Sequence, residues 1–169
     1  MLDDGRAFKG MKEVKQLLDE MAILKMNTFH WHLTEDQGWR IEIKKYPLLT
    51  EIGAHRDSTQ LNWYESKVFD GKPFDGYYTQ REIKEIVSYA RNLHITVVPE
   101  IEMPGHASAA IAAYPWLGST DEKIKVPCTF GVKNSAFNVA DPRTRTFLKD
   151  VLDEVMELFP SRTVSYTHL

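Results

Sequence analysis

"HITVVPEIEMPGH", residues 94–106, is the stretch that decides the predicted fold. Its opening HITVV is a continuous, mainly apolar run, which is the pattern of a strand that is buried on both faces of a parallel sheet. Two acids, Glu100 and Glu102, follow with a spacing of two, and the stretch ends in a turn and His106. Because side chains alternate along an extended chain, the two acids share one face. The sequence therefore predicts a buried strand with ionisable side chains at its carboxyl end.

Hydrophobic periodicity switches between the helical and the extended pattern along the rest of the chain. Apolar residues recur at spacings of three and four over residues 11–25, which predicts an amphipathic helix, and a Thr-x-x-Glu capping box at Thr79 predicts the start of another. In chain order we predict a strand at the N-terminus, a helix over 11–25, a strand over 27–33, a helix from 79, a strand over 94–98, a short helix over 107–113 and a helix from 141.

This alternation of strands and helices predicts an α/β protein. Polar residues gather after the strands, as they do in a TIM barrel, and the Gly-rich phosphate turn of a doubly wound sheet is absent. Two long excursions, 41–78 and 114–141, are rich in turn-forming and aromatic residues. We therefore favour a partial TIM (β/α)8 barrel, consisting of the first three or so βα units with long βα loops, over an open sheet.

Composition limits the class of protein. The chain has 169 residues, of which 43% are hydrophobic and 27% charged, values typical of one globular domain. A net charge of −3 with mixed signs predicts no nucleic-acid partner, and no apolar run approaches the roughly 20 residues of a membrane helix. The single cysteine, Cys128, excludes a disulfide within the chain and a cysteine-built zinc site. The oligomeric state stays open.

The segment NTFHWHLTEDQGWR, residues 27–40, carries a second group of ionisable side chains. Glu35 and Asp36 lie just beyond the predicted strand, and His106 lies at the matching place after the next strand. A carboxylate that binds one imidazole nitrogen fixes the tautomer of the ring and leaves the other nitrogen for a second acid. We therefore predict a cross-strand pair that supports proton transfer.

His30 and His32 lie two positions apart on the same predicted strand, so both side chains share one face. One alternative is therefore a metal-dependent, amidohydrolase-like barrel that binds its ion through His30, His32 and His106. No further His-x-His pair or clustered Asp/His set completes a metal shell in the sequence. We predict neither a metal nor another cofactor.

Aromatic residues are dense around the polar segments, and their rings are surfaces on which sugar rings stack. Most aromatic residues simply pack in cores, but a non-catalytic sugar-binding domain is a second alternative, with Trp39 and its neighbours as contacts. The aromatic residues concerned are Trp39, Tyr46, Trp63, Tyr64, Tyr77, Tyr78 and Trp116.

Four separated blocks of sequence resemble one family. They are HWHLTEDQGWRIEIKKYPLLTEIGAHR, YYTQREIKEIVSYA, VVPEIEMPGH and LDEVMELFP. In this order they are similar to the N-terminal part of the catalytic barrel of glycoside hydrolase family 20, the β-N-acetylhexosaminidases. The resemblance runs from Met1 to about Pro160. We therefore expect residues 1–160 to be the N-terminal part of that barrel and residues 161–169 to be an atypical tail that is not native family sequence.

The resemblance implies a glycan substrate with a terminal, non-reducing β-linked GlcNAc or GalNAc, which the family removes with retention of configuration by a substrate-assisted route. Many members have Asp where this chain has Glu35 and Glu102, so these carboxylates reach further here. Glu35 resembles the acid that hydrogen-bonds the histidine, and that histidine contacts the general acid. By position, the resemblance implies supporting catalytic roles for Glu35, Glu102 and His106 and substrate-binding roles for His32, Asp36 and Trp39.

The sequence departs from the family pattern at its end. The general acid and the acetamide-orienting Asp of the family lie in a His-x-Gly-Gly-Asp-Glu strand that should follow MELFPSR, and TVSYTHL follows here instead. We therefore expect these 169 residues to be inactive alone. An incomplete barrel also exposes strand edges and apolar helix faces, so we expect marginal stability. From the resemblance, bacterial members are expected to act outside the cytoplasm.

Overall fold

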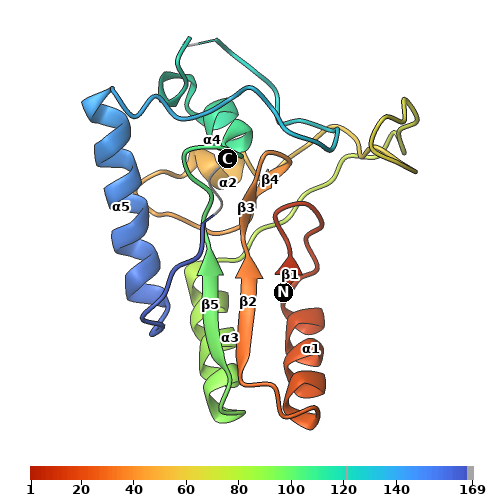
Figure 1. Cartoon of the computed structure of the whole chain (residues 1–169), viewed down its shortest axis with the longest axis vertical. Coiled ribbons are helices and arrows are strands. Elements are labelled where there is room, and N and C mark those ends of the chain that lie inside the picture. The colour runs from red at the N-terminus through yellow and green to blue at the C-terminus, as the bar shows by residue number, and fades with distance from the viewer. Residues whose placement is uncertain (121, 167–169) are drawn as a thin grey trace.

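The structure is a computed structural model that describes residues 1–120 and 122–166. Its centre is a parallel sheet of three strands, β1 (Leu2–Asp3), β2 (Thr28–His32) and β5 (Thr96–Glu100), in the order β1-β2-β5 (Figure 1). The helix α1 (Met11–Ile23) connects β1 to β2, and α3 (Gln80–Asn92) precedes β5. Strands of this sheet that follow one another in sequence are therefore neighbours in space.

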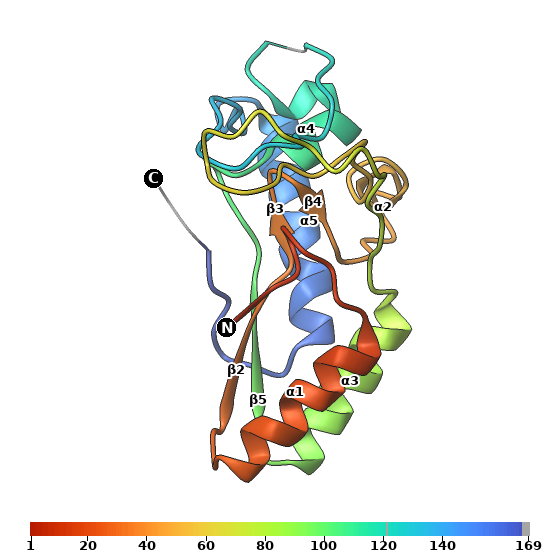
Figure 2. The ribbon, with the colours of Figure 1, turned by 90° about the vertical axis from the view of Figure 1, so that its right-hand side faces the viewer.

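The long helices cover one face of this sheet. α1 and α3 pack against each other, and α5 (Pro142–Leu158) packs against α3 on the same side of the strands (Figure 2). A doubly wound sheet carries helices on both faces, whereas sequential parallel strands with helices on the outside are typical of a βα barrel. The predicted α/β class is confirmed, and the partial barrel stays a prediction. No helix in the described ranges combines the length and hydropathy needed to cross a bilayer.

Local signals set the ends of two helices. Thr79 accepts a hydrogen bond from the backbone N–H of Glu82, and the carboxylate of Glu82 accepts one from the backbone N–H of Thr79, so the predicted capping box forms at the start of α3. Asp141 caps α5 by accepting a 2.8 Å hydrogen bond from the backbone N–H of Arg143. The apolar residues that these two helices bury are Ile83, Ile86, Ala90, Phe147, Val151, Val155 and Leu158.

The strand β5 differs from its prediction by two residues at each end. We predicted a strand over 94–98, and it runs from Thr96 to Glu100. His94 has a φ of 57° and belongs to the turn that ends α3. The carbonyl of Pro99 accepts a hydrogen bond from the N–H of Ser165, on the side of β5 away from β2. The backbone nitrogen of a strand residue points to the same side as its carbonyl, so Pro99 fits inside the strand. The N–H that proline lacks is therefore not needed for the ladder between β2 and β5.

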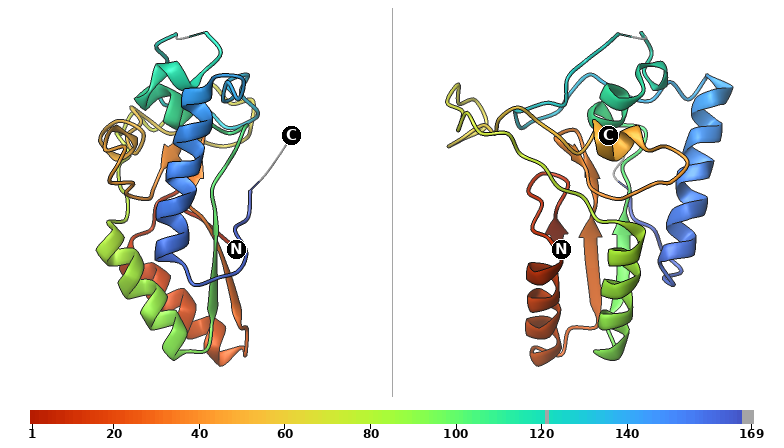
Figure 3. Two further views of the ribbon diagram at one scale, coloured as in Figure 1. Left: turned by 90° about the vertical axis from the view of Figure 1, so that its left-hand side faces the viewer. Right: turned by 180° about the vertical axis from the view of Figure 1, so that it is seen from behind.

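The segments that follow β2 and β5 lie toward the carboxyl ends of these strands (Figures 1 and 3). The antiparallel hairpin that continues from β2 consists of β3 (Thr34–Glu35) and β4 (Gly38–Trp39). The short helices in the loop regions are α2 (Leu48–Glu51), α4 (Ser108–Ala113) and the 3-10 helix η1 (Pro115–Leu117). Both predicted excursions therefore contribute to the same end of the sheet.

Part of the predicted tail pairs with β5. The N–H of Ser165 donates to the carbonyl of Pro99 at 2.8 Å, and its carbonyl accepts from the N–H of Ile101 at 3.0 Å. This is a parallel bridge beside Glu100, at the edge of β5 that faces away from β2. The last three residues of the tail, 167–169, lie outside the described residues.

Arg40 ties the loops at this end together. The side chain is fully buried, and burial and the charge of Arg56 lower its pKa to about 10. A β carbon on Gly38 would lie 2.1 Å from the buried guanidinium of Arg40, so the close approach of this side chain favours glycine at the start of β4. The guanidinium donates to the backbone carbonyls of Asp4, Gly5, Gln37, Ala54 and Gly76. One buried cation therefore links the loop after β1 to the hairpin and to the first excursion.

Candidate active site

The carboxyl ends of β2 and β5 bring three side chains together. Glu35 lies in β3, Asp36 lies in the turn after it, and His106 lies in the loop between β5 and α4. Nδ1 of His106 is 2.7 Å from Oε1 of Glu35 and 3.2 Å from Oδ2 of Asp36. The predicted pairing of carboxylate and imidazole across the strands is therefore present, and the catalytic roles of these residues stay a prediction.

Hydrogen bonds fix the backbone that carries His106. This residue has a φ of 50°, in the left-handed region that residues other than glycine seldom adopt. Oδ1 of Asp36 accepts from the backbone N–H of Ser108 at 3.0 Å and from its Oγ at 2.5 Å. Ser108 begins α4, so Asp36 holds the start of that helix while its second oxygen faces the imidazole. Surrounding contacts of this kind are what allow an unfavourable backbone conformation to persist at a site.

Glu35 is the most strongly perturbed acid of this group. It is 1% exposed, its Oε1 accepts from the backbone N–H of Asp36 at 2.9 Å, and its Oε2 lies 3.0 Å from Nη2 of Arg6. Burial raises the pKa of Glu35 to about 7, although the Asp36 N–H and the positive charges of Arg6 and His106 act in the opposite direction. A carboxyl group that titrates near neutral pH can hold or release a proton at working pH.

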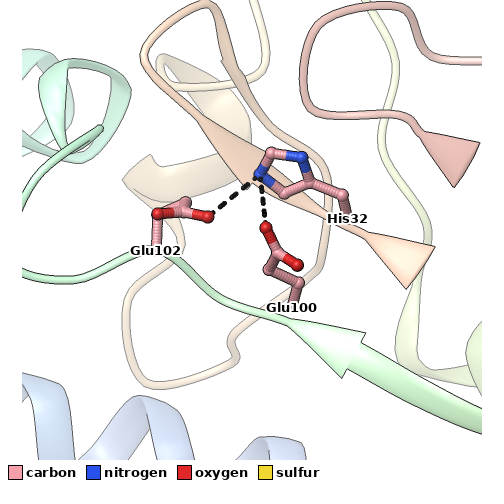
Figure 4. A group of neighbouring side chains, drawn as sticks. All are labelled: His32, Glu100 and Glu102. Carbon is pink, nitrogen blue, oxygen red and sulfur yellow. Dashed lines mark ion pairs between the residues drawn. The ribbon is translucent and has the colours of Figure 1, made fainter. Parts of the chain in front are cut away.

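A second cluster surrounds His32, and the carboxylates of Glu100 and Glu102 both approach the same nitrogen of its ring (Figure 4). Nε2 of His32 is 3.3 Å from Oε1 of Glu102 and 3.6 Å from Oε1 of Glu100. Nε2 also lies 3.6 Å from Glu35, and Nδ1 lies 3.4 Å from Asp3. Burial by itself would lower the pKa of His32, but the surrounding carboxylates outweigh burial and raise it. A protonated His32 therefore offsets part of the negative charge of four acids.

Glu100 is held as a carboxylate by its neighbours. It contacts Nε2 of His30, and it accepts a 2.9 Å hydrogen bond from Oγ of Ser165. Burial would raise the pKa of Glu100, but hydrogen bonds and the charge of His32 lower it to about 2. The predicted shared face of Glu100 and Glu102 is confirmed, because both carboxylates approach the same imidazole.

One predicted site residue, Trp39, packs in the core of the described structure. Trp39 is 3% exposed, its Nε1 donates to the carbonyl of Ile41 at 2.8 Å, and its ring centroid lies 6.5 Å from that of Phe147 in the core. Packing against α5 gives Trp39 a role in the core, and its predicted contact with substrate stays a prediction. The five predicted residues that do lie together are His32, Glu35, Asp36, Glu102 and His106.

Two residues that hold this site were not predicted from the sequence. Arg6 contacts both Asp3 and Glu35, and Ser108 binds Asp36. The position of Arg6 just after β1 is a signal that could have indicated this, because residues after neighbouring parallel strands meet at the same edge. Nothing in the spacing of Ser108 pointed to Asp36.

Two groups among the described residues could hold a metal ion. Each group offers three ligand atoms within 4.8 Å of one another, and the groups are His32 with Glu100 and Glu102, and Glu35 with Asp36 and His106. The metal-dependent alternative required His30, His32 and His106 to converge. His106 instead pairs with Glu35 and His30 pairs with Glu100, so His32 and His106 lie in different groups and His30 lies in neither.

Carboxylates paired with imidazoles at the carboxyl end of a parallel sheet define an α/β domain with a candidate acid–base site. The whole sequence, residues 1–169, matches the family model described as Glycosyl hydrolase family 20, catalytic domain. The chain belongs to this family. The membership expected from four blocks of sequence is therefore confirmed.

Individual relatives agree with this assignment. The chain is 46% identical to a beta-hexosaminidase of Porphyromonas gingivalis over 169 residues, which cover all of this chain and 20% of the relative. The beta-N-acetylhexosaminidase from Bacteroides fragilis is a similar solved structure, with 47% identity, a TM-score of 0.77, and coverage of 95% of this chain and 29% of the other. An exo beta-N-acetylglucosaminidase from Vibrio harveyi, solved in complex with N-acetylglucosamine, gives 39% identity, a TM-score of 0.78, and coverage of 95% and 25%. The chain spans less than a third of each of these proteins.

Proposed function

We propose that this chain is the N-terminal part of the catalytic (β/α)8 barrel of a β-N-acetylhexosaminidase. Membership of the family supports this proposal, as do the sequential parallel strands with helices on one face. The small share of each relative that the chain covers also agrees with a part of a larger catalytic domain.

The proposed reaction removes a terminal, non-reducing β-linked GlcNAc or GalNAc with retention of configuration. In the substrate-assisted route the carbonyl oxygen of the 2-acetamido group attacks the anomeric carbon, a general acid protonates the leaving oxygen, and water then opens the oxazolinium intermediate. The N-acetylglucosamine in the Vibrio harveyi structure is the observation that points to this class of sugar.

Glu35 and His106 carry the proposal for this site. The 2.7 Å contact between Oε1 of Glu35 and Nδ1 of His106 orients the ring, so Nε2 is the nitrogen left to address a general acid supplied by another part of the barrel. Asp36 holds the start of α4 and faces the same ring. In this proposal Glu35 and His106 position the general acid, and Asp36 contributes to the wall of the sugar pocket.

The cluster around His32 has a different proposed role. Glu100 and Glu102 approach one imidazole from β5 and the loop after it, and Glu35 approaches from β3. A buried network that contains a protonated imidazole can donate a hydrogen bond to the Asp that orients the acetamide group, and this bond keeps that Asp fixed while the amide attacks. We place His32 and Glu102 in this supporting network.

We further propose that the 169-residue polypeptide does not turn over substrate by itself. The sequence contains no His-x-Gly-Gly-Asp-Glu segment, which in the family supplies both the general acid and the acetamide-orienting Asp. General acid catalysis and substrate orientation each contribute several powers of ten in rate. Their loss removes measurable turnover.

A chimera tests the proposed function. In the Porphyromonas chimera, residues 1–160 of this chain replace the matching segment of the Porphyromonas gingivalis beta-hexosaminidase, to which the chain is 46% identical. We expect the Porphyromonas chimera to hydrolyse p-nitrophenyl β-N-acetylglucosaminide and the 169-residue chain to show no turnover. A folded chimera without activity, or activity of the short chain that a chelator abolishes, contradicts the proposal.

A further inference from the structure

A hairpin in the first excursion presents the most exposed aromatic residues of the loop region. Its arms pair through an antiparallel bridge between Gln60 and Phe69 and a 2.8 Å hydrogen bond from the N–H of Leu61 to the carbonyl of Val68. We call residues 60–69 the aromatic hairpin. It extends from the carboxyl-end side of the sheet, in the yellow part of the ribbon (Figure 1).

A buried side chain makes the aromatic hairpin a built structure. Gln60 is 4% exposed, and its Nε2 donates to the carbonyls of Tyr64 and Ser66 at 2.9 and 2.6 Å. Its Oε1 accepts from the N–H of Phe130 at 2.7 Å, and its backbone N–H donates to the carbonyl of Cys128 at 2.9 Å. Because a single buried amide satisfies groups on both segments, it fixes the aromatic hairpin to the second excursion.

Tyr64 makes a second contact between these segments. A β carbon on Gly131 would lie 2.1 Å from Cε2 of Tyr64, so the ring packs directly on the glycine backbone. Gly131 also has a φ of +92°, which residues with a side chain rarely adopt. The ring is therefore held in place on one side while the residue remains 65% exposed.

The same two segments are attached to the candidate active site. Nε2 of Gln37 donates to the carbonyl of Thr129 at 2.9 Å, and the carbonyl of Gln37 accepts from Nη1 of Arg56 at 3.2 Å. Gln37 is 2% exposed and directly follows Asp36. The aromatic hairpin is thus linked through residues 128–130 to Gln37, which directly follows the residue that contacts His106.

The exposed surface of the aromatic hairpin suits a carbohydrate. Trp63 is 68% exposed, and polar side chains at Asn62, Glu65 and Lys67 are exposed beside it. Two adjacent large aromatic residues that remain in water on a rigid support indicate a binding surface. Rings interleaved with hydrogen-bonding groups match the apolar faces and hydroxyl edges of sugar rings better than they match an apolar protein surface.

We propose that the aromatic hairpin binds the leaving-group side of a glycan substrate, with Trp63 and Tyr64 as stacking surfaces. This inference rests on the proposed function, in which the terminal N-acetylhexosamine occupies the pocket beside Asp36 and His106. The remainder of the glycan then has to extend outward over the loops that follow the strands. The aromatic hairpin contributes affinity for oligosaccharides and none for the free monosaccharide.

The test measures the binding of two ligands to the 169-residue chain and to matched variants of it. Chitotriose and GlcNAc are titrated while the indole N–H signal of Trp63 and the ring signals of His106 are followed by NMR. Chitotriose should shift the Trp63 signal, and Trp63→Ala should weaken its binding by roughly five- to tenfold, a loss appropriate to one stacked aromatic ring. Trp63→Phe should recover most of the affinity. GlcNAc should bind the unchanged chain and the Trp63→Ala variant with equal affinity.

Ile23→Ala provides the matched control, because Ile23 is 80% exposed at the far end of α1 and has no place in the proposed surface. If His106 responds to chitotriose but Trp63→Ala binds as the unchanged chain does, the aromatic hairpin proposal is overturned and the proposed function stands. If Trp63 responds and His106 does not, the aromatic hairpin binds glycan away from the candidate active site, which overturns its proposed role on the leaving-group side, and the Porphyromonas chimera alone then decides the proposed function. Trp63 shifts that depend on protein concentration rather than on sugar indicate self-association and overturn the proposal.

Discussion

Nδ1 of His106 and Oε1 of Glu35 lie 2.7 Å apart although the two residues follow different strands of the sheet. The second oxygen of Glu35 faces Arg6 at 3.0 Å, so one buried carboxylate joins segments after β1, β2 and β5. This contact orients the imidazole and couples its surroundings to an acid that titrates near neutral pH.

Glu35 makes stability depend on pH in a defined direction. Its pKa rises from an ordinary value of 4.5 to about 7 on folding, so the folded chain binds this proton more tightly than the unfolded chain. The associated stability is present below pH 4.5 and is lost as pH rises toward 7, by at most about 3 kcal/mol. Glu35→Gln should remove this loss. Chemical denaturation of the unchanged chain and of the Glu35→Gln variant across this pH range gives the free energy of unfolding of each. If the two plots of this free energy against pH are parallel, the prediction is contradicted.

Glu100 acts in the opposite direction and at lower pH. Because its pKa falls to about 2 on folding, its contribution is present above pH 4.5 and is lost as pH falls toward 2. Glu100→Gln should flatten the acid side of the stability curve by roughly 1–2 kcal/mol. Acid titration followed by circular dichroism checks this. An unchanged acid midpoint in the variant would mean that the contacts with His30 and Ser165 do not hold the carboxylate.

His106 should matter for turnover in the Porphyromonas chimera. His106→Ala removes the ring that Glu35 orients, so kcat should fall by on the order of 100-fold. His94→Asn is the matched control, since His94 is exposed and asparagine tolerates its φ of 57°. Steady-state kinetics on a chromogenic GlcNAc glycoside separate the two. Equal kcat values for both variants would exclude the positioning role.

Trp39 should affect stability and leave sugar binding unchanged. Trp39→Phe leaves the carbonyl of Ile41 without its 2.8 Å donor in the core, which should cost about 1–2 kcal/mol of unfolding free energy. The same substitution at the exposed Trp63 should change stability by less than about 0.5 kcal/mol. Urea denaturation measures both. A loss of GlcNAc affinity in a stable Trp39→Phe chain would support the predicted substrate contact.

Arg40 should be among the most costly residues to replace. Arg40→Met removes the donors of five backbone carbonyls in the core, so we expect a loss of roughly 3–5 kcal/mol. Arg81→Met on the exposed face of α3 is the control and should be nearly neutral. Thermal unfolding of the two variants distinguishes them, and similar melting temperatures would contradict the structural role of Arg40.

The predicted elements are close to those of the structure wherever a local signal marks them. The capping box at Thr79 and the cap at Asp141 place the starts of α3 and α5 correctly. The strand expected from residue 94 begins two residues later, because His94 completes a turn that apolar pattern alone does not show. Pro99 extends the strand because its missing N–H lies on the outer edge, which is a property of the sheet.

The amino-acid sequence by itself determined the order of the three sheet strands and of the helices α1, α3, α4 and α5, the shared face of Glu100 and Glu102, and the family to which the chain belongs. These properties depend on residue spacing and on local backbone hydrogen bonds, which neighbouring positions specify. Only the tertiary structure decided that Trp39 fills the core and that Arg6 reaches Glu35. Burial and ion pairing depend on how segments that are distant in sequence pack together, and residue spacing within one segment does not predict that packing.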